Sequence, residues 1–230
     1  MNIVLPARFI AAMLALACSA PAFAQLDKIS NQDANAGLKA ALEKGSLAAV
    51  ATLGRTDGFL GNEKVRIPLP DSLDSVASVM RRFGMGKYAD ELVQTMNRAA
   101  EAAVPEAKAL FVDAVRKMTV QDAKAILGGG DTAGTEYFKR STSDPLRARF
   151  LPIVAKATKK VKLADRYNEY ASKGERFGLV SKEDANLDNY VTQKALDGLF
   201  YVVAEEEKKI RRDPVGTASS IIKKVFGALL

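Results

Sequence analysis

The side chains that most often carry enzyme chemistry are nearly absent from this sequence. The chain contains no histidine, and its only cysteine is Cys18. Without an imidazole, no side chain has an ordinary pKa close to neutrality, and one cysteine cannot supply the ligands of a zinc site. Zinc centres, Ser-His-Asp triads and Cys-His pairs are therefore excluded. We predict no catalytic residue, no metal and no cofactor. Carboxylate, lysine, tyrosine or serine chemistry remains, as does binding without chemistry.

Two carboxylates support the only enzyme hypothesis, a carboxylate-dependent hydrolase. Asp197 lies inside an apolar run, residues 195–204, where a buried carboxylate would have a raised pKa unless it were paired. Glu101 lies close to Arg98 in the sequence. Structural ion pairing explains both residues more simply, because ion-pair networks also shift pKa values. The hydrolase therefore stays an alternative.

Basic side chains are concentrated in one segment, residues 139–166. The segment holds nine basic and two acidic residues, a local charge of +7, whereas residues 25–230 together are near +6. The candidate ligand-binding residues are Arg140, Arg147, Arg149, Lys156, Lys159, Lys160 and Lys162. Such a surface attracts anionic lipid head groups. A solvated face balanced by acidic helices is an equal alternative. We expect no nucleic acid, because aromatic side chains do not alternate regularly with the basic ones.

The C-terminal segment, residues 217–230, has an apolar face. That face consists of Ile222, Val225, Phe226 and Leu229, with two lysines beside it. An amphipathic helix of this kind makes peripheral contact with a membrane or docks on an envelope protein partner. The preferred interpretation is that this helix packs its apolar face against the protein's own bundle.

The first 24 residues have the pattern of a secretory signal. Arg8 provides positive charge, the apolar stretch 9–17 follows, and residues 22–24 read Ala-Phe-Ala. The stretch is shorter than the roughly 20 residues that span a bilayer, and the closing tripeptide is a cleavage pattern. We therefore predict removal of residues 1–24 and a periplasmic protein. The alternative is a lipoprotein acylated at Cys18, although the residues before it fit that signal less well.

Composition and periodicity predict an all-α, single-domain, multi-helix bundle over residues 25–230. Alanine, leucine and charged helix formers are abundant. The helix at about 187–211 is apolar nearly all round in its middle, so we place it at the centre of the bundle. Residues 57–70 resist a helical interpretation, because Val65, Ile67 and Leu69 alternate with two prolines. This segment is expected to be an edge strand or an extended strap.

The other helices are predicted from residues that typically begin or end a helix. They cover residues 30–53, 71–83, 87–118 (divided at Pro105), 132–142, 163–171 and 217–230, and two more begin at Thr119 and Pro145. Apolar residues of 71–83 are expected on one side, namely Leu73, Val76, Val79, Met80 and Phe83. The glycine run 128–130 lacks the lysine of a phosphate-binding loop. We interpret it as a helix end, with Asp131 capping the next helix and Ser143 and Asp144 capping the one after.

Four runs of sequence carry a family resemblance. They are residues 118–131 with the following Tyr137-Phe138, residues 190–201 continuing through 205–211, residues 97–101, and the Ile67–Pro70 segment. Together they resemble the bacterial domain of unknown function 4197 family over essentially the whole chain beyond the secretory signal. The resemblance implies an exported helical protein. It implies no activity and no site residues.

These observations lead to one principal hypothesis and two alternatives. The principal hypothesis is a non-enzymatic periplasmic binding protein that holds an amphipathic or anionic lipid-like ligand between helices. Its basic segment would lie near the head group and residues 57–70 would act as a lid. The alternatives are a protein-interaction or envelope-maintenance module, supported by the amphipathic C-terminal segment, and the carboxylate-dependent hydrolase.

Overall fold

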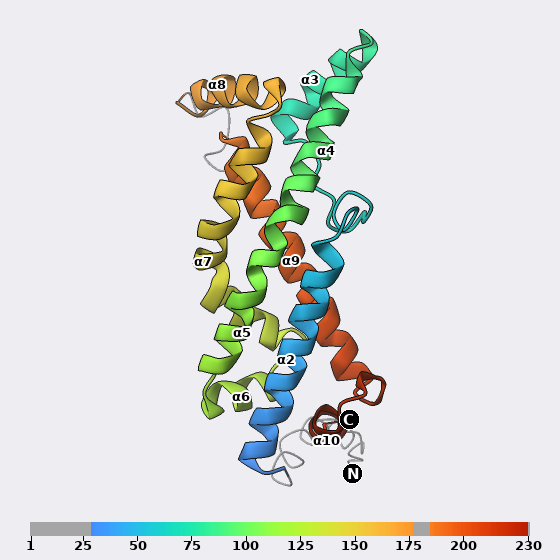
Figure 1. Cartoon of the computed structure of the whole chain (residues 1–230), viewed down its shortest axis with the longest axis vertical. Coiled ribbons are helices and arrows are strands. Elements are labelled where there is room, and N and C mark those ends of the chain that lie inside the picture. The colour runs from blue at the N-terminus through green and yellow to red at the C-terminus, as the bar shows by residue number, and fades with distance from the viewer. Residues whose placement is uncertain (1–28, 177–184, 230) are drawn as a thin grey trace, which may run out of the picture.

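The computed structural model describes residues 29–176 and 185–229, which form an elongated bundle of helices (Figure 1). Its long helices are α2 (Asn31–Leu53), α4 (Gly86–Ala103), α5 (Ala107–Lys117), α7 (Ala133–Thr158) and α9 (Leu187–Arg212). The shorter helices are α3 (Asp71–Arg82), α6 (Val120–Leu127), α8 (Lys162–Arg176) and α10 (Ser220–Gly227), with 3-10 turns η1 (Val104–Glu106) and η2 (Val215–Thr217). The described residues contain no strand, so the all-α prediction is confirmed. The predicted secretory signal and Cys18 lie outside the described residues.

The predicted central helix is confirmed as α9. It packs most extensively on α7 and α2, and it also contacts α4. Three aromatic rings meet on its inner side: Phe111 of α5 lies 4.7 Å from Phe138 of α7 and 6.2 Å from Phe200 of α9, between ring centroids. A helix that is apolar nearly all round needs such neighbours on several sides.

Several helix ends follow the caps in the sequence. The Ser30 side chain accepts a hydrogen bond from the Asp33 amide at the start of α2. Thr119 and Asp122 form a reciprocal capping box at the start of α6. Pro105 divides α4 from α5 through η1, as predicted. These ends depend on local chemistry, which explains why the sequence predicts them well.

The largest correction to the predicted elements concerns α7. One helix spans Ala133–Thr158 and includes Pro145 and Pro152, so no new helix begins at Pro145. The Ser143 hydroxyl, predicted to be a cap, instead donates to the Lys139 carbonyl at 2.7 Å, one turn back within the helix. Buried Leu146, Phe150 and Val154 continue the apolar stripe past the prolines. Tertiary packing therefore maintains the helix where local propensity would end it.

One further boundary and one cap also differ from the predictions. Helix α8 continues to Arg176, five residues past the expected end at Ala171. Asp131 does not cap α7, because the N-cap position is Thr132 and no cap side chain bonds there. The apolar residues predicted on one side of α3 differ in exposure: Leu73 is buried, whereas Val79 and Phe83 are 52% and 75% exposed. The Val76 side chain lies outside the described part of the chain.

Residues 57–70 form an irregular segment that we call the strap. The second of the two predicted forms, an extended segment, is present only at residues 66–70, because residues 57–61 and 63–65 form turns. Four of its expected anchors, Phe59, Val65, Ile67 and Leu69, are buried, while Leu60 is half-buried. The strap leads directly into α3, and Figure 1 shows it looping beside α4. Its apolar residues therefore help to fill the core without forming a strand.

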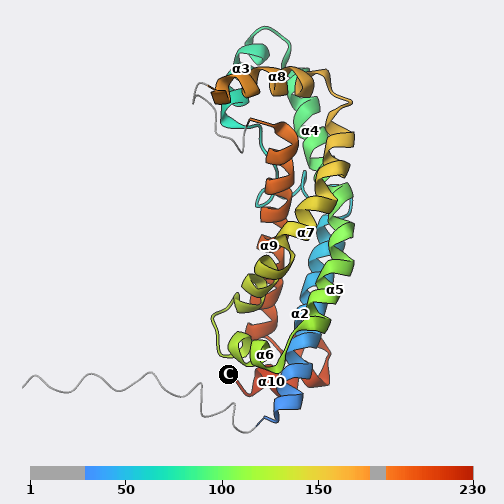
Figure 2. The ribbon, with the colours of Figure 1, turned by 90° about the vertical axis from the view of Figure 1, so that its left-hand side faces the viewer.

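The C-terminal helix α10 packs against α2 at the end of the bundle opposite α3 and α8 (Figure 2). Ile222, Val225 and Phe226 are buried there, and Leu229 packs against the core. The apolar face proposed for membrane contact is therefore occupied by the protein's own core. Contact with a membrane through these side chains would require α10 to detach.

Glycines on α9 and α2 give a matched pair of stability predictions. A Cβ at Gly198 would lie 2.7 Å from the Phe59 ring and 3.2 Å from Val65 Cβ, whereas a Cβ at Gly45 would meet nothing closer than 3.5 Å. We expect Gly198→Ala to lower the free energy of unfolding by about 1–3 kcal/mol through overpacking. Gly45→Ala should raise it by up to about 1 kcal/mol through helix propensity. Urea unfolding measures both, and equal effects of the two substitutions would contradict the close packing of the strap on α9.

Candidate functional site

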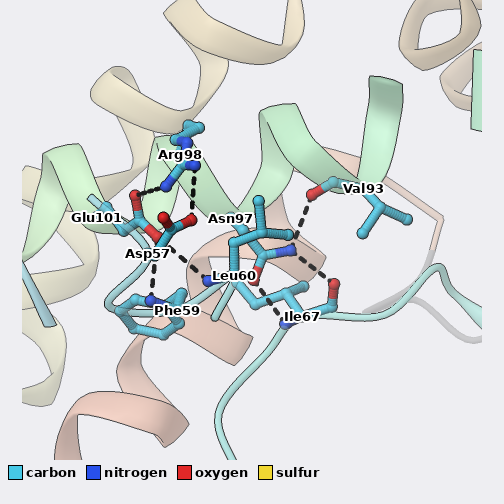
Figure 3. A network of polar contacts seen from close by, with 8 residues as sticks. All are labelled: Asp57, Phe59, Leu60, Ile67, Val93, Asn97, Arg98 and Glu101. Carbon is cyan, nitrogen blue, oxygen red and sulfur yellow. Dashed lines mark hydrogen bonds and ion pairs between the residues drawn. The ribbon is translucent and has the colours of Figure 1, made fainter. Parts of the chain in front are cut away.

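The strap is held to α4 by a buried asparagine, Asn97 (Figure 3). Its side-chain carbonyl accepts from the Ile67 amide at 2.8 Å, and its amide group donates to the Ile67 carbonyl at 2.9 Å and to the Val93 carbonyl at 2.8 Å. Asn97 thus pairs with Ile67 as a neighbouring strand would. This pairing gives hydrogen-bond partners to the backbone amide and carbonyl of Ile67, which have no neighbouring strand in a bundle of helices.

A second contact, formed by Glu101 and Arg98, holds the start of the strap (Figure 3). Glu101 Oε1 accepts from the amides of Phe59 and Leu60 at 3.0 and 3.1 Å, and its Oε2 lies 2.6 Å from Arg98 Nη1. Arg98 Nη2 lies 2.7 Å from the Asp57 carboxylate. Hydrogen bonds from Arg98 to Glu101, and then to Asp57, raise the pKa of the guanidinium above its ordinary value. Arg98 is therefore a permanent cation in this contact.

These positions assign structural roles to both carboxylates of the hydrolase hypothesis. Glu101 is buried with both oxygens engaged, so the predicted ion pairing is present. Asp197 is exposed rather than buried in the apolar helix, and it accepts from Gln193 at 2.7 Å. A general base needs access to the proton it removes. Glu101 lacks that access in this arrangement, and Asp197 lacks the predicted apolar environment.

A third carboxylate, Glu207, was not among the predicted functional residues. Although it lies in a run of charged residues, 205–209, it is buried on α9. Its oxygens accept from the amides of Gly134 and Thr135 at 2.9 and 2.8 Å, so it caps the start of α7 from a distant helix. Arg211 lies 3.0 Å away, one turn later on α9. The sequence contains no signal for this role, because Asp131 and Thr132 are themselves ordinary capping residues, although neither side chain caps α7 in the structure.

The structure does not bring the predicted basic residues onto one face. Arg140 and Arg147 lie about two turns apart on one side of α7, and Arg149 and Lys156 lie about two turns apart on the other side. Arg147 donates to Gln193, and Arg149 forms an ion pair with Glu106 at 3.3 Å. These two arginines are therefore engaged by other helices.

Four of the predicted basic residues do lie together, at the junction of α7 and α8. We call Lys156, Lys159, Lys160 and Lys162 the lysine cluster. All four side chains are exposed, and none forms an ion pair with a residue of the described ranges 29–176 and 185–229. The stretch 155–163 contains no acidic residue. Asp188 of α9 accepts a hydrogen bond from Thr158 in this stretch but forms no described ion pair with the four lysines. The lysine cluster is thus a local excess of positive charge.

Two pockets in the described part of the chain are relevant to the prediction that a ligand lies between helices. The pocket between α2, α9 and α10 has a volume of about 10 Å³, which is room for about one water molecule. An open groove of about 460 Å³ lies between the strap, α3 and α4, and its charged lining has both signs, from Glu63, Arg66, Asp74 and Arg81. The strap beside it is fixed by buried hydrogen bonds, which a lid would have to break.

Within the described residues, no group of three or more acidic, histidine or cysteine side chains could hold a metal ion. No helix of that part of the chain is long and apolar enough to cross a membrane.

The fold and its polar contacts define a class: an elongated all-α bundle with a clamped strap and a basic end. Residues 28–227 match the family described as proteins of unknown function, DUF4197, so the chain belongs to that family. No curated protein matches the chain. No solved structure matches it either.

Proposed function

We propose that this chain is an exported, non-enzymatic protein of the bacterial envelope that binds an anionic, lipid-like ligand at the end of the bundle formed by α3, α7 and α8. The lysine cluster is the observation that carries the proposal. Its four amino groups are exposed and without a described ion-pair partner, so they are available to phosphate groups. The pattern of residues 1–24 supports export.

The charge of the lysine cluster is sufficient for surface binding. A lysine near an anionic lipid surface contributes about 1 kcal/mol, so four of them give an association about a thousandfold stronger than that of an uncharged surface. Each lysine carries a compact ammonium group on a flexible side chain, so it can bind phosphate groups in varied orientations. The pocket between α2, α9 and α10 is too small to enclose a lipid chain. We therefore expect the head group to bind at the protein's surface.

A charge-matched pair of variants tests this proposal. The first variant replaces Lys156, Lys159, Lys160 and Lys162 by alanine. The control replaces four exposed lysines elsewhere, Lys108, Lys117, Lys124 and Lys223, and so changes the net charge equally. In flotation with phosphatidylglycerol vesicles, the first variant should lose at least about tenfold in binding, while the control should retain most of it. Equal losses would show that only net charge matters and would contradict a site at the lysine cluster.

A further inference from the structure

The turn between α3 and α4 exposes an unusual amount of apolar surface. Seven large hydrophobic side chains are exposed in the described part of the chain, and four of them lie within ten consecutive residues. They are Val79, Phe83, Met85 and Tyr88, with exposed fractions of 52%, 75%, 45% and 45%. We call residues 79–88 the apolar tip. Single exposed hydrophobic residues are normal, but clustered ones mark an interaction surface.

The apolar tip has a defined backbone. Gly84 adopts a left-handed conformation with φ of 73°. The Gly84 amide donates to the Arg81 carbonyl at 3.1 Å, and the Met85 amide donates to the Met80 carbonyl at 2.8 Å. This pair of bonds is the Schellman motif, which ends a helix on a glycine. The motif fixes the turn and leaves the Phe83 side chain with few neighbours.

Positive charge surrounds the exposed apolar side chains. Residues 79–88 contain Arg81, Arg82 and Lys87 and no acidic residue. Arg81 pairs with Asp90 at 3.1 Å, and Lys87 lies over the Tyr88 ring at 5.1 Å. Aromatic and aliphatic side chains bordered by basic ones are typical of segments that enter the interface of an anionic membrane.

The apolar tip lies at the same end of the molecule as the lysine cluster. Both views show the α3–α4 turn and α8 at one end of the bundle and α10 at the other (Figures 1 and 2). The Ser72 and Tyr167 hydroxyls, 3.1 Å apart, join α3 to α8. An elongated molecule that meets a surface with this end presents both features together.

We propose that the apolar tip inserts into the interface of an anionic bilayer, so that the ligand is a membrane surface and not a single amphiphile. This inference rests on the proposed function and adds the insertion step. The lysine cluster attracts the phosphate layer, and Phe83 and its apolar neighbours enter the acyl boundary. The tip carries three basic side chains, of which Arg81 is paired with Asp90, and the remaining Arg82 and Lys87 favour an anionic lipid surface over an apolar protein groove.

The absence of tryptophan from the chain makes a direct test possible. Phe83→Trp places a single tryptophan at the tip, and Val215→Trp places one at the opposite end, at a position that is 67% exposed. With vesicles of phosphatidylglycerol, the emission of Phe83→Trp should shift to shorter wavelength and be quenched by brominated acyl chains. The emission of Val215→Trp should change little. Phe83→Ser, at an exposed position, should fold normally and reduce vesicle partitioning about tenfold.

The possible failures are distinguishable. If the chain binds vesicles through the lysine cluster but neither Phe83→Trp emission nor Phe83→Ser partitioning changes, insertion is wrong and the proposed function stands. If the chain binds monomeric dodecyl phosphate through the lysine cluster and no vesicle, the inference alone is again overturned. If the chain binds neither probe, both proposals fail. If Phe83→Ser converts a lipid-free dimer to a monomer, the tip is a contact between two copies, which also overturns the inference.

Discussion

Replacing Glu207 by alanine should lower the free energy of unfolding by about 3–5 kcal/mol, which is the typical cost of removing one partner from a buried ion pair. The substitution leaves Arg211, only 12% exposed at its side chain, without its carboxylate. It also leaves the buried amides of Gly134 and Thr135 without an acceptor at the start of α7. Chemical unfolding followed by circular dichroism measures the loss. Glu207→Gln, which keeps one acceptor oxygen, should lose less.

Glu205, two residues earlier on α9, provides the control for this substitution. Glu205 pairs with Lys208 at 2.9 Å, and both side chains are about one-third exposed. Glu205→Ala should therefore cost no more than about 1 kcal/mol, as surface ion pairs usually do. If Glu207→Ala were no more destabilising than Glu205→Ala, the capping of α7 from α9 would be wrong.

Replacing Asn97 by alanine should cost about 2–4 kcal/mol, because the buried amide and carbonyl of Ile67 would each lose their partner. The effect should be concentrated in the strap. Amide hydrogen exchange should accelerate at residues 57–70 more than in α9, because Asn97 bonds directly to the strap backbone at Ile67 and not to α9. Glu101 and the Tyr190 hydroxyl hold other residues of the strap. Unfolding by urea gives the overall loss, and exchange monitored by mass spectrometry gives its location.

Gln94 offers the matched control for Asn97 on the same helix. It lies about one turn earlier on α4 and is exposed, so Gln94→Ala should change stability by no more than about 0.5 kcal/mol. A strap that exchanges at the same rate in both variants would show that Asn97 does not hold it. In that case a movable lid would again be an acceptable account of residues 57–70.

The sequence predicted those parts of the fold that depend on local pattern. The central helix, the Thr119 cap and the division at Pro105 all follow from residues close together in the chain. The two failures in α7 have a common cause. Its continuation past Pro145 depends on side chains buried against other helices, and its cap comes from Glu207, more than seventy residues away. Such tertiary effects override propensity and leave little trace in one sequence.

The candidate site was predictable only in part. The excess of positive charge near the end of α7 was visible in the sequence, and four of the seven chosen residues form the lysine cluster. The sequence did not show that Arg147 and Arg149 are engaged by other side chains, because their partners Gln193 and Glu106 come from other helices. The exposure of the apolar tip was not predictable, since a stripe of apolar residues on a helix does not reveal whether a neighbour covers it.

Flotation of the unmodified chain with two kinds of vesicle tests the central claim most directly. The chain should associate with phosphatidylglycerol vesicles at low salt and not with phosphatidylcholine vesicles. The association should fall steeply toward 1 M salt, where the screening length shrinks to about 3 Å. Equal binding to both vesicles, or no binding to the anionic ones, would contradict an account in which exposed lysines at one end of the bundle recognise an anionic lipid surface.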